Sequence, residues 1–129
     1  LIKPNHHELG EIFRKTLKNT DEIAHYAKEM QKMGARNVLV SMAANGALLV
    51  DETDRVHIIG TAKGKAVNSV GAGDSMVAGF LAGYLERNDY SYALALGSAA
   101  GSATAFSEGL ANKELVFRLL NEIQSEKIQ

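Results

Sequence analysis

The chain has 129 residues, of which 46% are hydrophobic, and its formal net charge at pH 7 is -1. This length can bury one compact core, and the near-neutral charge gives no electrostatic reason to expect a nucleic acid or an anionic membrane as a partner. The chain has no cysteine, which excludes disulfides and thiolate metal sites, and no apolar run reaches the length of a transmembrane helix. We therefore expect one soluble, cytoplasmic domain.

The first third of the chain predicts a short strand followed by two helices. The strand is an apolar run that ends at Pro4, and Asn5 is placed to cap the first helix. The residues expected on the buried face of that helix are Leu9, Ile12 and Phe13. A second helix is expected over residues 20–33, with acidic residues in its first turn and Gly34 at its end. Further core residues are expected at Met30, Met33 and Phe80.

Three short runs rich in β-branched residues predict strands, and the remainder of the chain predicts helices. The strands are expected at residues 37–43, 47–51 and 56–60, joined by hairpin turns. The helices are expected at residues 71–86, 90–107 and 112–127, the last capped by Asn112. The first two are apolar on nearly all sides, which is typical of buried helices packed on a sheet. The pattern predicts one α/β layer structure, with antiparallel strands in a mixed sheet covered by helices.

The stretch GAGD places glycines and one carboxylate at the start of an apolar helix. A dinucleotide-binding G-x-G-x-x-G beginning at Gly71 would need glycine at position 76, where the chain has Met76. What remains is a loop whose backbone N–H groups, at Gly71, Ala72 and Gly73, can point at one spot near the positive end of the helix dipole. The carboxylate of Asp74 lies beside them. Such a site suits an anion that is held next to a base.

Phosphoryl transfer to a hydroxyl has this requirement. N–H donors stabilise the charge on the transferred group, while a carboxylate within reach of the alcohol takes its proton. Asp74 is the only acidic residue in the loop. In the structural alternative, Asp74 complements the helix dipole and the glycines allow close packing. The spacing alone leaves both interpretations open.

The run VNSVGAGDSMVAGF resembles the second signature of the ribokinase-like (PfkB) carbohydrate kinases. This resemblance implies that Gly71, Ala72 and Gly73 form an anion hole and that Asp74 is the catalytic base. It also implies a ribokinase-like three-layer α/β fold, of which this chain is the C-terminal part only. Residues 1–129 would then be the nucleotide-binding portion of a sugar kinase domain, without the N-terminal substrate and lid portion.

Other segments are similar to the family's nucleotide-binding elements. NHHE looks like the N-x-x-E element that helps to place metal and phosphates, which implies that Asn5 and Glu8 act on Mg²⁺ through water. SMAANGALLV is similar to the strand-turn-strand segment that lines the nucleotide, and AAGSATAFSEG to the helix and loop that wall the adenine. The residues implied at the nucleotide are Lys3, Asn5, Ser41, Gly46, Ser98 and Ser102. Those implied at a monovalent-cation site for K⁺ are Val70, Thr104, Ser107 and Gly109.

Within the family, the chain looks most like the branch of 1-phosphofructokinases and tagatose-6-phosphate kinases. The resemblance implies ATP-dependent conversion of fructose 1-phosphate to fructose 1,6-bisphosphate, and a homodimer in the complete enzyme. Two alternatives stay open: a kinase for another sugar, a nucleoside or a vitamin, and a nucleotide-binding module without catalysis. We expect the chain alone to be inactive, because the residues that grip the sugar belong to the absent portion.

Overall fold

The computed structural model describes residues 1–42, 46–60, 72–105 and 113–128. The chain divides into two compact units, Leu1–Ile58 and Ile59–Gln129. Of the hairpin turn predicted at residues 44–46, only Gly46 is described, and the predicted cap Asn112 lies outside the described residues. In the described ranges, no helix is both long and apolar enough to cross a membrane.

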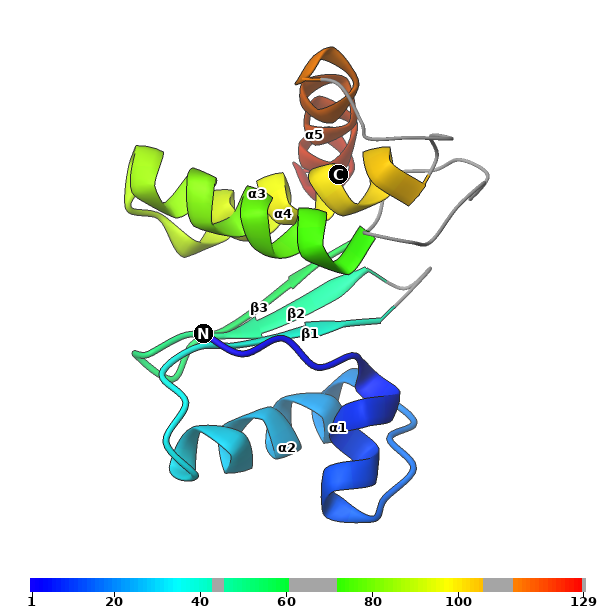
Figure 1. Ribbon diagram of the computed structural model, residues 1–129, viewed down its shortest axis with the longest axis vertical. Coiled ribbons are helices and arrows are strands. Elements are labelled where there is room, and N and C mark those ends of the chain that lie inside the picture. Colours follow the sequence, from blue (N-terminus) through cyan, green and yellow to red (C-terminus); the bar gives the residue numbers. More distant parts are fainter. Residues whose placement is uncertain (43–45, 61–71, 106–112, 129) are drawn as a thin grey trace. The chain divides into compact units, whose positions relative to one another are not determined.

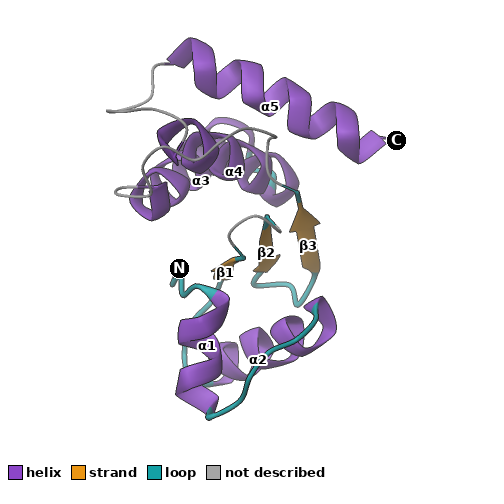
Figure 2. Cartoon of the chain, turned by 90° about the vertical axis from the view of Figure 1, so that its right-hand side faces the viewer, coloured by secondary structure: helices purple, strands orange, loops and turns teal. Residues whose placement is uncertain are grey.

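In the first unit, two helices lie on one face of a three-stranded sheet (Figures 1 and 2). The helices are α1 (His6–Phe13) and α2 (Thr20–Lys32). The strands, in spatial order, are β1 (Val38–Ser41), β2 (Ala47–Val50) and β3 (Val56–Ile59). β1 and β2 pair antiparallel, as the short β-rich runs predicted.

The predicted N-terminal strand forms only isolated bridges beside β1. Ile2 pairs with Val38 and Asn5 with Ser41, both in parallel orientation. Pro4 lies between the two bridges and has no N–H, so a regular ladder cannot run through it. Its carbonyl oxygen still accepts a hydrogen bond from the N–H of Ser41 at 3.1 Å. Parallel and antiparallel neighbours of β1 together give the mixed sheet that was predicted.

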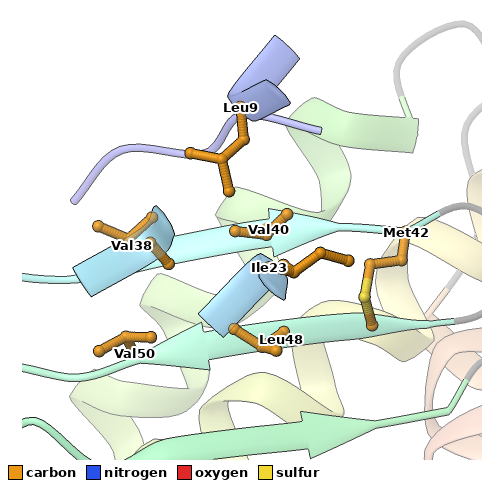
Figure 3. Close-up of a cluster of buried hydrophobic side chains, with 8 residues drawn as sticks. Leu9, Ile23, Val38, Val40, Met42, Leu48 and Val50 are labelled. Carbon is orange, nitrogen blue, oxygen red and sulfur yellow. The ribbon is translucent and has the colours of Figure 1, made fainter. Parts of the chain in front are cut away.

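The core of the first unit lies between the sheet and its two helices (Figure 3). It is built from Leu9, Ile23, Ala27, Val38, Val40, Met42, Leu48 and Val50. The strand residues among them alternate along β1 and β2, as a pleated strand with one face toward the helices requires. Two predicted core residues are wrong: Ile12 is 49% exposed and Met33 is 69% exposed. Ile12 lies beside the stripe that faces the core, and Met33 follows the last residue of α2.

The second unit contains α3 (Ala72–Arg87), α4 (Tyr90–Ala105) and α5 (Lys113–Ile128). α4 packs against both α3 and α5, and most of its residues are buried, as its apolar sequence predicted (Figure 2). α3 does not match the prediction of burial on nearly all sides. Phe80 is buried against α4, but Leu85 is 86% exposed, because among the described residues α3 packs mainly against α4.

Candidate active site

Three residues predicted at the nucleotide lie at one end of the sheet in the first unit. Asn5 bridges to Ser41, and Ser41 pairs with Ala47 across β1 and β2, so that Gly46 adjoins this pair. Gly46 has a φ of 96°, a left-handed conformation that favours glycine, and its carbonyl oxygen accepts from the N–H of Met42 at 2.8 Å. The fold therefore gathers positions 5, 41 and 46 at one end of the sheet, and their contacts with a nucleotide stay a prediction.

Asn5 and Glu8 form a capping box at the start of α1. The side-chain oxygen of Asn5 accepts from the N–H of Glu8 at 2.8 Å, and Glu8 Oε1 accepts from the N–H of Asn5 at 2.9 Å. The sequence predicted Asn5 as the cap but not the second hydrogen bond, from the N–H of Asn5 to Glu8. The spacing N-x-x-E is typical of such a capping box and could have indicated it. Glu8 is exposed and Lys3, two residues before Asn5, is half-buried. The predicted metal pair is thus held together by the helix start itself.

In the second unit, the GAGD motif enters the first turn of α3. The helix begins at Ala72, so Gly73 and Asp74 also belong to its first turn, whose N–H groups the helix leaves without internal acceptors. Asp74 is exposed. Gly71, the first residue of the predicted anion hole, lies outside the described residues. The described part of the motif thus combines helix N-terminal donors with a carboxylate that faces solvent.

The hydroxyl groups predicted at the adenine and at the cation lie along α4 and are buried. Ser98 Oγ donates to the carbonyl oxygen of Gly60 at 2.9 Å, and Thr104 Oγ1 donates to Ser75 Oγ at 2.7 Å. Ser102 is also buried. Sequence reasoning missed both hydrogen bonds, because no local pattern signals partners 38 and 29 residues away. The ligand roles of these residues stay predictions. Outside the described residues lie Val70, Ser107 and Gly109.

Two curated enzymes resemble the chain over nearly its whole length. It is 48% identical over 128 residues to the 1-phosphofructokinase of Bacillus subtilis, a match covering 99% of this chain and 42% of that protein. It is 42% identical over 125 residues to the D-tagatose-1-phosphate kinase of Bacillus licheniformis, covering 96% of this chain and 41% of that protein. The chain thus spans about two fifths of the length of the curated relatives that it matches.

A solved structure shares the fold. Phosphofructokinase-2 from Escherichia coli, in complex with substrates and products, superimposes with a TM-score of 0.85 at 29% identity, covering 95% of this chain and 40% of that chain. The ribokinase-like α/β fold that the sequence predicted is therefore confirmed. The profile of the pfkB family of carbohydrate kinases matches residues 1–115, which is most of the sequence. The chain belongs to the pfkB family of carbohydrate kinases.

Proposed function

We propose that the complete enzyme built on this chain transfers the terminal phosphoryl group of ATP to a hydroxyl of fructose 1-phosphate, giving fructose 1,6-bisphosphate. The main support for this proposal is the position of Asp74, whose carboxylate is exposed in the first turn of α3. The 48% identity to a 1-phosphofructokinase supports this acceptor. Tagatose 1-phosphate is the second candidate, because a kinase named for it is 42% identical. It replaces the tagatose 6-phosphate suggested by the sequence resemblance.

In this proposal the start of α3 supplies both the base and the donors. Asp74 accepts the proton of the attacking hydroxyl as the hydroxyl oxygen bonds to phosphorus and ADP leaves. The N–H groups of Gly71, Ala72 and Gly73 donate to the oxygens of the transferred group. Negative charge is spread over these oxygens in the transition state, and donors that are already oriented stabilise it without reorganisation.

The first unit suits Mg²⁺ bound through its water shell. Among the described residues, no three His, Asp or Glu side chains could hold a metal ion together. Mg²⁺ usually keeps several waters and takes one or two carboxylates plus substrate phosphates, so the exposed Glu8 beside Asn5 fits it. When bound, the ion would neutralise phosphate charge. We assign nucleotide contacts to Lys3, Asn5, Ser41, Gly46, Ser98 and Ser102. We assign K⁺ contacts to Val70, Thr104, Ser107 and Gly109.

The test of this proposal is a chimera in which the chain replaces the stretch that it matches in the Bacillus subtilis 1-phosphofructokinase. Asp74→Asn keeps the shape of the side chain and removes the base. We expect kcat to fall about 10²–10⁴-fold, with nucleotide affinity close to unchanged. If Asp74 only complements the helix dipole, turnover will stay near normal and the free energy of unfolding will fall by roughly 0.3–1 kcal/mol.

The matched control is Glu114→Gln, since Glu114 is an exposed carboxylate in the first turn of α5 and lies outside the motif. This change should leave kcat unaltered. The acceptor is tested in the complete enzyme that contains this chain, because the residues that grip the sugar are proposed to lie outside these 129 residues; kcat/KM is compared for fructose 1-phosphate, tagatose 1-phosphate and unphosphorylated fructose. A folded chimera that binds ATP and phosphorylates none of them would contradict the proposal in favour of a nucleotide-binding module.

A further inference from the structure

A hydrogen bond joins the end of α4 to the first turn of α3. Thr104 Oγ1 donates to Ser75 Oγ at 2.7 Å, and Ser75 directly follows Asp74 in the chain. We infer that Thr104 is a positioning residue: through Ser75, it holds the first turn of α3 in the orientation that Asp74 needs to accept a proton. This inference rests on the proposed function, which makes Asp74 the base.

Glycines of α4 bring its backbone against α3 over the same stretch. A Cβ atom on Gly97 would lie 2.8 Å from the carbonyl oxygen of Met76, and one on Gly101 would lie 3.2 Å from that of Ala72. The same Cβ atoms would also lie 3.3 Å from the side chain of Phe80 and 3.4 Å from that of Met76, so the two helices are in close contact along this stretch. Thr104, three residues after Gly101, adds a directional bond at the end where α3 begins.

The surroundings of Thr104 make this bond a strong restraint. Its side chain is buried, with 4% of the residue exposed. A hydrogen bond is stronger in the interior than at the surface, and leaving a hydroxyl unpaired there costs more free energy. Because threonine branches at Cβ, its χ1 angle in a helix is restricted to two rotamers, and the one adopted here directs the hydroxyl at Ser75. Ser75 is therefore bonded to a buried donor on α4 whose freedom to turn away is small.

Asp74 itself is exposed, so the backbone on either side of it determines where the carboxylate lies. A general base must come within hydrogen-bond distance of the proton that it removes. A displacement of about 1 Å at a catalytic group can cost on the order of 10²-fold in rate. Freeing the first turn of α3 to rotate should therefore lower kcat more than it weakens ATP binding.

The test uses Thr104→Val in the chimera, which exchanges the hydroxyl for a methyl group of similar volume. We expect kcat to fall by about 10-fold or more while the KM for ATP stays within about twofold. Thr104→Ser restores the donor and should recover most of the lost kcat. Thr16→Val is the matched control, since Thr16 is exposed and lies outside α3 and α4; it should leave kcat unchanged.

A double mutant separates positioning from general stability. If Thr104 acts through Asp74, then Thr104→Val should lower kcat no further once Asp74→Asn is present, because the positioned base is gone. An equal loss in both backgrounds would overturn the inference. So would near-normal kcat for Thr104→Val alone, provided that Asp74→Asn shows its large loss. Near-normal turnover of Asp74→Asn would instead overturn the proposed function.

A second readout uses the 129-residue chain itself and needs no activity. Amide hydrogen exchange at Met76, whose N–H can bond to the carbonyl oxygen of Ala72 at the start of α3, should be faster in Thr104→Val. Exchange at Phe80, further along the helix, should change less. Unaltered protection at Met76 would contradict the inference. If Thr104→Val does not fold, Ser75→Ala replaces it in the kinetic and the exchange measurements, because it removes the acceptor of the same hydrogen bond.

Discussion

Glu8 combines a structural and a proposed functional role in one side chain. Its Oε1 atom closes the capping box with Asn5, and the residue is exposed near the end of the sheet where Ser41 and Gly46 lie. A capping box alone explains the N-x-x-E spacing without a metal. The two roles can be separated, because the cap needs a hydrogen-bond acceptor whereas the metal shell needs a charge.

In the chimera, Glu8→Gln keeps an acceptor for the N–H of Asn5 and removes the charge. We expect it to raise the Mg²⁺ concentration needed for half-maximal activity with little change in the thermal midpoint. Glu8→Ala loses both roles, so it should also cost on the order of 1 kcal/mol in the free energy of unfolding. These quantities are measured by Mg²⁺ titration of turnover and by thermal denaturation.

Glu22→Gln is the matched control for the Glu8 variants. Glu22 lies in the first turn of α2, and its Oε2 atom accepts from the N–H of Lys18 at 2.9 Å, so that it resembles Glu8 as a cap but lies outside the family's motif. Its Mg²⁺ dependence should match that of the unaltered chimera. If Glu8→Gln also leaves the Mg²⁺ dependence unchanged, the metal role of Glu8 is wrong.

The predicted site residues differ in how far the sequence could place them. Asp74, Gly73 and Asn5 stand in contiguous motifs at helix starts, where the backbone geometry follows from the local sequence. Ser98 and Thr104 lie within a long apolar helix, and the direction of their hydroxyls depends on what packs against that helix. Local sequence could assign them to α4 but could not identify their hydrogen-bond partners.

Among the elements, the connection between β2 and β3 is organised by one buried carboxylate. Asp51 is 2% exposed and accepts hydrogen bonds from the N–H groups of Thr53 and Arg55, while His57 Nε2 lies 2.7 Å from Asp51 Oδ2. Burial alone would raise the pKa of Asp51. The hydrogen bonds from Thr53, His57 and Arg55 outweigh it and lower the pKa to about 2.

This lowered pKa predicts how stability depends on pH. A carboxyl group whose pKa is lower in the folded chain than the unfolded value, about 3.9, contributes stability that is complete above that value. The contribution is lost as pH falls toward about 2. It amounts to about 2 kcal/mol, so the free energy of unfolding of the 129-residue chain should decline by that amount over this range. Urea titrations between pH 7 and pH 2 measure the decline.

Asp51→Asn should flatten this part of the pH profile, because it removes the group that titrates. The control is Asp54→Asn, since Asp54 belongs to the same turn but is exposed, and asparagine tolerates its positive φ of 69°. That variant should keep the decline between pH 4 and pH 2. Equal profiles for the two variants would show that Asp51 does not stabilise the connection in this way.

Elements with strong local signals were predicted close to their observed bounds. The long helices at Ala72–Arg87 and Tyr90–Ala105 follow apolar patterns, and β1 and β2 follow β-branched runs. The patterns could not tell which sides would be covered. α3 has an apolar sequence all round, yet Leu85 is exposed, because burial depends on the neighbours that a helix meets in the fold. Its local sequence resembles that of the buried α4.

At the scale of the whole molecule, the proposed functions are divided between two compact units. The first unit contains the end of the sheet at which Asn5, Ser41 and Gly46 lie. The second unit contains the start of α3 with Asp74. The chain spans about two fifths of the length of its curated relatives. We therefore propose that the residues that grip the sugar phosphate belong to a portion outside this chain.

This division predicts that the 129-residue chain binds ATP or ADP weakly and transfers no phosphoryl group at a useful rate. The donors of a helix start form locally, but a base accelerates transfer only when the acceptor hydroxyl is held against it, and positioning of reactants contributes a large part of catalysis. Turnover of fructose 1-phosphate by the chain alone should be at least roughly 10³-fold below that of the chimera. Isothermal titration calorimetry with ATP measures the affinity, and a coupled kinase assay measures the turnover.

The chimera is the positive control for this prediction, and its Asp74→Asn variant gives the rate of transfer without a base. Robust turnover by the chain alone would mean that the acceptor site lies within these 129 residues.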